Sequence, residues 1–289
     1  MSKNFLIAVF TFATLGGVNA QANLLTAQKA SDIGKISAEQ IAADNDGPIP
    51  YGYVDDRDVL WSKIVWEFVD LSQKINLPFY FPKDTAKIST DRRSLFDTLL
   101  KGIRQGKITE VYEDSYFKNK FSKKQVEDRI YYVREYTGKD GNQYRDPYFV
   151  KTEEVTGYMI KGMWFFDKRQ GELKYRLLGI APMGEDVKKK GTVAENSKET
   201  LELFWVFFPN ARNVLHAAKV FNPKNSTHPI SFDHLLNSRR FSSIIVQEEN
   251  VYGNRAIKNY VRGNSLFQLL EANKIKEDIR NKEIDMWNY

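Results

Sequence analysis

TGYMIKGMWFFDK (residues 156–168) and ELKYRLLGIAPM (172–183) lie close together in the middle of the chain and decide its fold class. Both are rich in aromatic and aliphatic residues, and a polar turn with Gln170 and Gly171 separates them. Two such runs around a short glycine-containing turn are typical of a β-hairpin. A third run, LELFWVFF (201–208), is apolar on both faces, which predicts a strand covered on both sides.

Helical periodicity precedes this predicted sheet. Apolar residues recur every three or four positions over 55–76, 91–104 and 123–135. Asp91 is the predicted N-cap of the second helix. Ser122 and Gln125 predict a capping box at the start of the third. The run PFYFP (78–82), with proline at both ends, is predicted to be extended.

Helices are also predicted after the sheet, over 210–216, 231–241 and from 265 to 279. Asn210 and Ser231 are the predicted N-caps of the first two, and Ser265 with Gln268 predicts a second capping box. Residues 242–246 favour a strand. The sequence therefore predicts an α+β fold, with an antiparallel β-sheet in the middle of the chain and helical segments at both ends.

Residues 1–20 have the three parts of a secretory signal peptide. Lys3 is the basic start, 5–15 are apolar, and small residues precede a predicted cut after Ala20. The apolar run is shorter than the roughly 20 residues that a membrane-spanning helix needs. The mature chain is expected to be exported.

Three parts of the chain are predicted from these patterns. After the signal peptide at 1–20, residues 21–50 form an extended N-terminal arm, either a linker or a tether across a neighbouring subunit. Residues 51–289 form a single α+β domain. Within it, 51–150 are expected to be mainly helical, 151–209 to form the antiparallel sheet and 210–289 to be mainly helical.

The composition excludes several kinds of site. None of the 289 residues is cysteine, so disulfides, cysteine-ligated metals and thiol nucleophiles are absent. The net charge is +6, but basic and acidic residues are interspersed, whereas nucleic-acid binders more often carry a concentrated basic stripe. No nucleic-acid partner is expected.

Catalytic patterns are also missing. The chain has no Walker loop, no GxGxxG and no GxSxG sequence. His228 and His234 do not have the i,i+4 spacing of a helical metal pair, and His216 is expected on a helix. Adjacent carboxylates such as Glu153 and Glu154 point apart on a strand or a helix. No catalytic, cofactor-binding or metal-ligating residue is predicted.

Aromatic residues make up 13% of the chain, and most are expected in the core. Tyrosine, tryptophan and arginine are also the residue types that anchor protein interfaces. Outside the strongest apolar stripes, the candidate partner-binding residues are Tyr51, Tyr53, Arg239, Arg240, Phe241, Trp287 and Tyr289.

Three blocks of sequence carry a family resemblance. They are DDRDVLWSKIVWEFVDLSQKINLPFYFP (55–82), VFNPKN (220–225) continuing through SFDHLLNSRRFSSIIVQEENVYGNRAIKNY (231–260), and EANKIKEDIRNKEIDMWNY (271–289). Together they resemble, in the same order, the gliding-motility protein GldN, called PorN in non-gliding relatives. The family has no catalytic motif to carry over.

The resemblance implies a non-enzymatic structural subunit of the type IX secretion and gliding-motility machinery. Its location would be the periplasm, at the inner face of the outer membrane. The implied partners are a GldK/PorK-like lipoprotein, GldL–GldM-like motor proteins and further copies of the chain in a ring. No cofactor is implied, and membrane association would be indirect, through the lipoprotein.

Two other functions remain open from the residues alone: an exported enzyme acting on cell-wall or glycan substrates, and an adaptor of another envelope complex. A pocket with convergent carboxylates would favour the enzyme. Exposed aromatic residues and an unpaired strand edge would favour the structural subunit.

Overall fold

The computed structural model describes residues 47–83, 92–137, 142–190, 200–220, 222 and 230–287. The predicted signal peptide at 1–20 and most of the predicted arm at 21–50 lie outside these residues. All the described residues belong to one compact unit.

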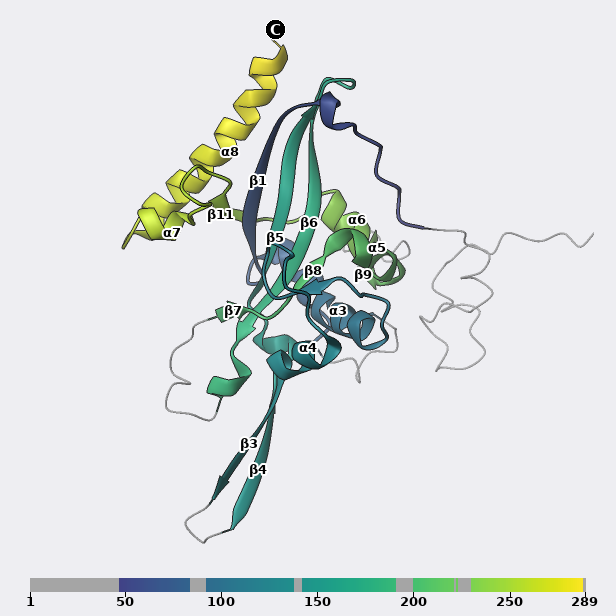
Figure 1. Ribbon diagram of the computed structural model, residues 1–289, viewed down its shortest axis with the longest axis vertical. Helices are drawn as coiled ribbons and strands as arrows, with labels where there is room; N and C mark the ends of the chain where they lie inside the picture. Colours follow the sequence, from purple (N-terminus) through teal and green to yellow (C-terminus); the bar gives the residue numbers. More distant parts are fainter. Residues whose placement is uncertain are drawn as a thin grey trace, which may run out of the picture. The chain divides into compact units, whose positions relative to one another are not determined.

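One antiparallel sheet organises this unit (Figure 1). In spatial order its strands are β11 (Ile244–Glu248), β1 (Val59–Asp70), β5 (Gly157–Asp167), β6 (Glu172–Glu185), β8 (Trp205–Phe207) and β2 (Val111–Tyr112), with β7 (Thr200–Glu202) also paired to β6. Two separate ribbons are formed by β3 (Tyr131–Thr137) with β4 (Gln143–Phe149), and by β9 (Lys219–Val220) with β10 (Ile230–Ser231).

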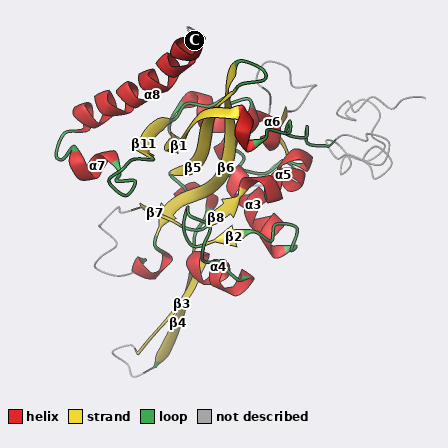
Figure 2. Cartoon of the chain, turned by 45° about the horizontal axis from the view of Figure 1, so that its top comes forward, coloured by secondary structure: helices red, strands yellow, loops and turns green. Residues whose placement is uncertain are grey.

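Helices pack around this sheet (Figure 2). They are α2 (Leu77–Tyr80), α3 (Leu95–Arg104), α4 (Lys123–Ile130), α5 (Phe208–Ala217), α6 (Phe232–Asn237), α7 (Ile257–Tyr260) and α8 (Ser265–Trp287). The main core joins α3, α5 and α6 to one part of the sheet, and a second cluster joins α8 to β1 and β11. The predicted α+β fold, with its sheet in the middle and helices towards both ends, is confirmed.

The central hairpin predicted over 156–183 is confirmed as β5 and β6. Gly171 lies in the turn with φ of 64°, a conformation that glycine adopts without strain. Gly162 in β5 allows the ring of Tyr175 to cross the strand, since a Cβ at Gly162 would lie 2.1 Å from the Tyr175 Oη. The strand predicted over 201–208 is divided into β7 and β8, and its expected burial on both faces is confirmed at Phe204, Trp205 and Val206.

The helix predicted over 55–76 is wrong, because residues 59–70 form strand β1. The apolar residues of this segment have the spacing of a helical stripe. In a strand, successive side chains point to opposite faces, and each face of this segment then carries apolar side chains. Ile64, Val65 and Trp66 are β-branched or aromatic, which favours a strand. β1 is paired on both sides, by β5 along its length and by β11 over its second half. The mainly helical character predicted for 51–150 is corrected accordingly, since this segment contains β1 to β4 besides α2 to α4.

Several helix boundaries also differ from the prediction. The run 78–82 is not wholly extended, because α2 includes its first three residues. The N-cap of α3 is Ser94, whose hydroxyl accepts a hydrogen bond from the Asp97 N–H, whereas Asp91 lies outside the described residues. The capping box of Ser122 and Gln125 is confirmed, but α4 ends at Ile130, where β3 begins.

Helix starts in the last third depend on particular polar side chains. Ser231 caps α6 as predicted, and the strand expected near 242–246 is β11. Asn210 lies inside α5 and accepts hydrogen bonds from the N–H groups of Thr109 and Glu110. The capping box predicted for α8 is wrong, because Asn264 accepts hydrogen bonds from the first N–H groups of that helix.

Candidate interaction site

The β3–β4 ribbon has no buried residue and is the main candidate interaction site. Its register pairs Tyr131 with Phe149 at the base and Thr137 with Gln143 at the far end. Figure 1 shows the ribbon extending from α4, away from the main sheet. Among the described residues, no third strand pairs with either edge. Both edges therefore offer backbone N–H and C=O groups to another strand.

Aromatic side chains cover this ribbon. The rings of Tyr136 and Tyr144 stack across it, with centroids 5.6 Å apart. The neighbouring Asp146 carboxylate raises the pKa of the Tyr136 phenol, which favours the neutral form of this side chain. Five large aromatic side chains of the ribbon are exposed to solvent: Tyr131, Tyr132, Tyr136, Tyr144 and Phe149. Exposed aromatic groups of this kind are typical of interface anchors.

Within the described residues, the ribbon is attached to the core at its base. Ile130 and Val150 are buried in the main core, and the Val150 N–H donates to the Ile130 carbonyl oxygen at 2.8 Å. A two-stranded hairpin is at best marginally stable by itself in water. A partner strand at one edge, or a partner surface over the tyrosines, would add packing to the ribbon.

The sequence contained a signal for this ribbon. Tyr132, Arg134 and Tyr136 alternate with other residues in the period of a strand, as do Tyr144 and Tyr148 after the glycine-containing stretch 138–141. The helical spacing of Val126 and Ile130 is continued by Val133. The sequence prediction therefore extended the helix to 135 and missed the change to the two-residue period of a strand after Ile130.

A second open edge belongs to β1. Strand β11 pairs only with Val65–Phe68, whereas β5 pairs with β1 along its whole length. Among the described residues, no strand pairs with the outer edge of 59–63. The side chain of Leu60 is exposed in this stretch. A strand of a partner could extend the sheet here.

Tyr51 and Tyr53 differ in their surroundings. The Tyr51 hydroxyl donates to the Asn237 Oδ1 at 2.8 Å, and its ring contacts the guanidinium group of Arg212. Burial raises the pKa of Tyr51. Tyr51 therefore attaches the start of the described chain to α6, whereas Tyr53 is 76% exposed and accessible to a partner.

The predicted partner-binding residues after α6 also differ in their surroundings. Arg239 forms an ion pair with Glu67 at 2.8 Å, and its guanidinium group lies 4.0 Å from the centre of the Tyr175 ring. The Phe241 ring packs edge-on against that of Phe79. These contacts give Arg239 and Phe241 structural roles, and Arg240 is exposed. The remaining candidates are near the C-terminus, where Trp287 ends α8 and Tyr289 lies outside the described residues.

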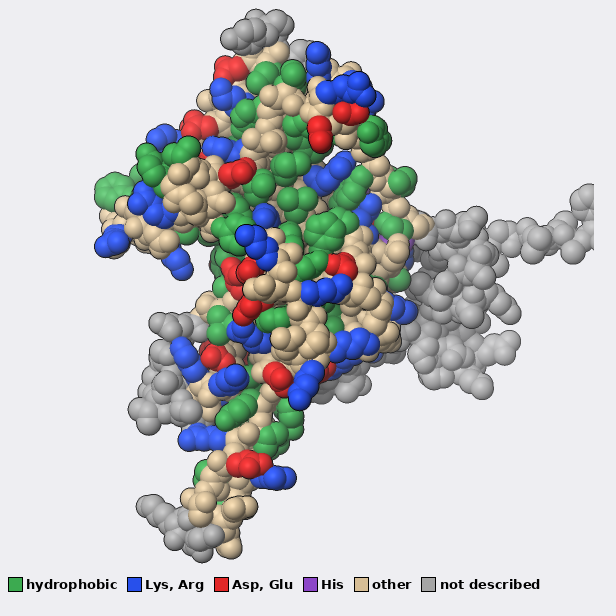
Figure 3. All heavy atoms as spheres, in the orientation of Figure 1, with side chains coloured by type: hydrophobic (Ala, Val, Ile, Leu, Met, Phe, Trp, Pro, Cys, Tyr) green, Lys and Arg blue, Asp and Glu red, His purple; other side chains and the backbone are tan. Residues whose placement is uncertain are grey.

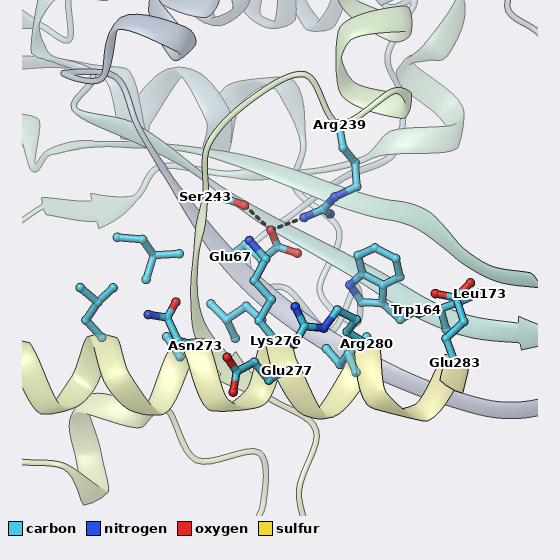
Figure 4. A pocket seen from close by; sticks show the side chains of 15 residues that line it. Glu67, Trp164, Leu173, Arg239, Ser243, Asn273, Lys276, Glu277, Arg280 and Glu283 are labelled. Atoms are coloured by element: carbon cyan, nitrogen blue, oxygen red, sulfur yellow. Dashed lines mark hydrogen bonds and ion pairs between the residues drawn. The ribbon is translucent and has the colours of Figure 1, made fainter. Parts of the chain in front are cut away.

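A cavity of about 460 Å³ lies between α8, β1 and the segment before β11. Figure 4 shows the Glu67 carboxylate at its wall, between Ser243 and Arg239. Glu277 and Glu283 also line the cavity, but the Glu277 carboxylate points away from Glu67, and the Glu283 carboxylate lies at the far end near Leu173, with Trp164 between it and Glu67 (Figure 4). A glycosidase needs two carboxylates that flank one bond. The arrangement is that of an ion pair inside the protein and does not support the enzyme alternative.

Histidine and metal sites give no support to catalysis either. His216 lies in α5 and His234 in α6, while His228 is outside the described residues. Within the part of the chain that the structure describes, no group of three or more potential ligands could hold a metal ion. The helices described there include none with the length and apolar character to cross a membrane.

Comparison with known proteins identifies the family. No curated protein matches the chain. The model of the family described as "Gliding motility associated protein GldN" matches residues 54–288, from just before β1 to the end of α8. The match confirms the resemblance carried by the three sequence blocks. The chain therefore belongs to the GldN family of gliding-motility-associated proteins, which are components of the type IX secretion machinery in the cell envelope.

Proposed function

We propose that this protein is a non-enzymatic structural subunit of the type IX secretion machinery. It works in the periplasm, peripheral to the inner face of the outer membrane. There it assembles with a GldK/PorK-like lipoprotein and with further copies of itself into a ring, and it links this ring to GldL–GldM-like motor proteins. Family membership supports a role in the secretion machinery, and the exposed aromatic side chains of the β3–β4 ribbon support a role in assembly.

The ribbon fits a subunit contact for two reasons. No described strand pairs with its edges, so a strand from a neighbour can be added, which gives directional hydrogen bonds and a defined register. Its exposed tyrosines can bury apolar surface, which contributes about 25 cal/mol for each Å² removed from water. We assign the ribbon to the lipoprotein contact.

The ribbon is tested by replacing the stacked pair Tyr136 and Tyr144 with serine. We expect the Kd for the lipoprotein to rise by about thirtyfold, because aromatic anchors account for much of the binding energy of interfaces. The loss of their stacking should lower the free energy of unfolding by no more than about 1 kcal/mol, because both rings are partly exposed and lie outside the main core. Tyr252→Ser is the matched control, because that tyrosine is also exposed but lies before α7. The readout is copurification of a tagged chain with the coexpressed lipoprotein, followed by a binding titration.

The outcomes separate the two parts of this proposal. Unchanged binding by the tyrosine variants would contradict the assignment of the ribbon. A tagged wild-type chain that never copurifies from cell envelopes with a lipoprotein would contradict the structural role in this ring.

Export is tested separately. We expect the native protein to begin at Gln21, because residues 1–20 have the basic, apolar and small-residue regions of a signal peptide. N-terminal sequencing of protein from fractionated cells measures this. An intact Met1 on protein recovered from the cytosol would contradict periplasmic localisation.

A further inference from the structure

The two outer edges of the β3–β4 ribbon are not equivalent. In an antiparallel pair, opposite residues alternate between those that bond to each other and those whose N–H and C=O groups point away from the other strand. The Val150 N–H donates to the Ile130 carbonyl oxygen, one position before the first pair of the register, Tyr131 with Phe149. The register then continues without a bulge. Even-numbered residues of both strands therefore bond across the ribbon, and odd-numbered residues direct their backbone groups outward.

The outer edge of β4 is obstructed. Its outward positions are residues 143, 145, 147 and 149. Pro147 has no backbone N–H, so an added strand would lack a ladder hydrogen bond there, and proline is typical of strand edges that stay unpaired. The Phe149 carbonyl oxygen accepts a hydrogen bond from the Lys190 ammonium group at 2.9 Å. A further strand could not form a continuous ladder along β4.

The outer edge of β3 has neither obstruction. Each of its outward positions has both an N–H and a C=O group; they are Tyr131, Val133, Glu135 and Thr137. Within the described ranges of the chain, no strand or turn bonds to these backbone groups. The β3 edge can therefore form a regular ladder with an added strand over its whole length.

The side chains beside this edge define what the added strand should carry. One face of the ribbon presents two tyrosine pairs in register, Tyr132 with Tyr148 and Tyr136 with Tyr144. Figure 3 shows hydrophobic side chains along the ribbon at the lower end of the view. Alternate side chains of an added strand would lie on this face, where β-branched and aromatic residues pack well against tyrosine. The other face includes Glu135, which would repel an acidic residue directly opposite.

We propose that the partner adds one extended strand to the β3 edge of the ribbon, and that Pro147 and Lys190 keep the β4 edge closed. This inference rests on the proposed function, because the partner is the lipoprotein assigned above to the ribbon. The recognised segment is extended over the seven residues that match β3. It alternates β-branched or aromatic residues with polar residues that are not acidic. Addition at one edge allows one partner strand for each ribbon, whereas two open edges would permit continued edge-to-edge association.

A pair of proline variants tests the assignment of the edge. Glu135 and Arg145 are directly opposite and form an ion pair at 2.9 Å, so Glu135→Pro and Arg145→Pro remove the same ion pair at the same level of the ribbon. Each also removes one outward N–H, the first from the β3 edge and the second from the β4 edge. We expect the Kd for the lipoprotein to rise at least about tenfold in Glu135→Pro, because a ladder hydrogen bond is lost and the ring obstructs the added strand. Arg145→Pro should stay within about twofold of the wild type, since an exposed ion pair contributes little.

A third variant separates the backbone from the side chain. Glu135→Ala removes the carboxylate and keeps the N–H group, so it should bind the lipoprotein like the wild type. A loss equal to that of Glu135→Pro would show that the partner contacts the carboxylate, and it would overturn strand addition at this edge.

Hydrogen exchange gives a second readout on the unsubstituted chain. In the free protein, the outward amides of both strands should exchange faster than the inward amides of residues 132, 134 and 136. In the complex with the lipoprotein, exchange at Val133, Glu135 and Thr137 should slow at least about tenfold, because these amides enter a ladder. Exchange at Gln143 and Arg145 should not slow. A partner that only covers the tyrosine rings would slow both sets alike or neither.

The outcomes distinguish this inference from the function on which it rests. Equal losses in the two proline variants, or equal protection of both edges in the complex, would overturn the assignment of the β3 edge. The proposed lipoprotein contact would then stand, since the wild type still binds. A loss only in Arg145→Pro would also overturn the assignment and would place the added strand at β4. No binding by the wild type would contradict the proposed function and this inference together.

Discussion

Replacing Trp205 with alanine is expected to lower the free energy of unfolding by about 3–5 kcal/mol, the usual cost of deleting a buried tryptophan side chain. Trp205 is fully buried in β8, where it packs with Trp66 and Ala181. Its Nε1–H donates to the Glu202 Oε2 at 2.6 Å. Burial raises the pKa of Glu202, so loss of this donor would leave a poorly solvated carboxyl group.

The measurement is equilibrium unfolding by denaturant, followed by far-ultraviolet circular dichroism. Trp205→Phe separates two contributions, because it keeps most of the ring volume and removes the hydrogen bond, and it should cost less than Trp205→Ala. Tyr53→Ala is the exposed control and should stay within about 0.5 kcal/mol of the wild type. A loss below about 1 kcal/mol for Trp205→Ala would contradict the central place of this side chain in the core.

Breaking the ion pair between Glu67 and Arg239 should have an effect of similar size. The Glu67 carboxylate is 2% exposed and accepts hydrogen bonds from Arg239 and from Ser243. Arg239→Met would leave that carboxylate without its cation, which for a buried pair typically costs about 3–5 kcal/mol. Arg240→Met is the matched control, since the neighbouring arginine is exposed.

A double-mutant cycle identifies the cause. Glu67→Leu combined with Arg239→Met removes both charges, and it should recover most of the stability lost in Arg239→Met alone. The readout is denaturant unfolding of the wild type, both single variants and the double variant. Additive losses, with no recovery, would show that the ion pair is not the source of the effect. A folded Arg239→Met variant that loses only its binding to the lipoprotein would restore this arginine as a partner-binding residue.

Short-range signals in the sequence were sufficient for part of the structure. The turn between β5 and β6, the capping box of Ser122 and Gln125 and the Ser231 cap all depend on residues within a few positions of one another. Such features form wherever the local hydrogen bonds and backbone conformations are compatible. The ordered blocks of sequence were also sufficient for the family, which the match over 54–288 confirms.

The candidate interaction site was predicted less completely. Tyr53 and Arg240 were predicted from residue type and are exposed, whereas Tyr51, Arg239 and Phe241 have contacts within the protein. Residue type cannot distinguish these cases, because tyrosine and arginine stabilise interfaces and interiors through the same contacts. The Arg239 partner is 172 positions away in the chain.

The sequence by itself therefore determined the fold class, the central hairpin, two helix caps and the family. Only the tertiary structure decided that 59–70 form a strand. The apolar residues of this segment fit both the helical and the strand period, and pairing with β5 and β11 selects the strand. The tertiary structure also decided that the helix after Ser122 stops at Ile130 and continues as the exposed ribbon. The physical reason is range: caps and turns depend on adjacent residues, whereas strand pairing and burial depend on residues brought together by the whole fold.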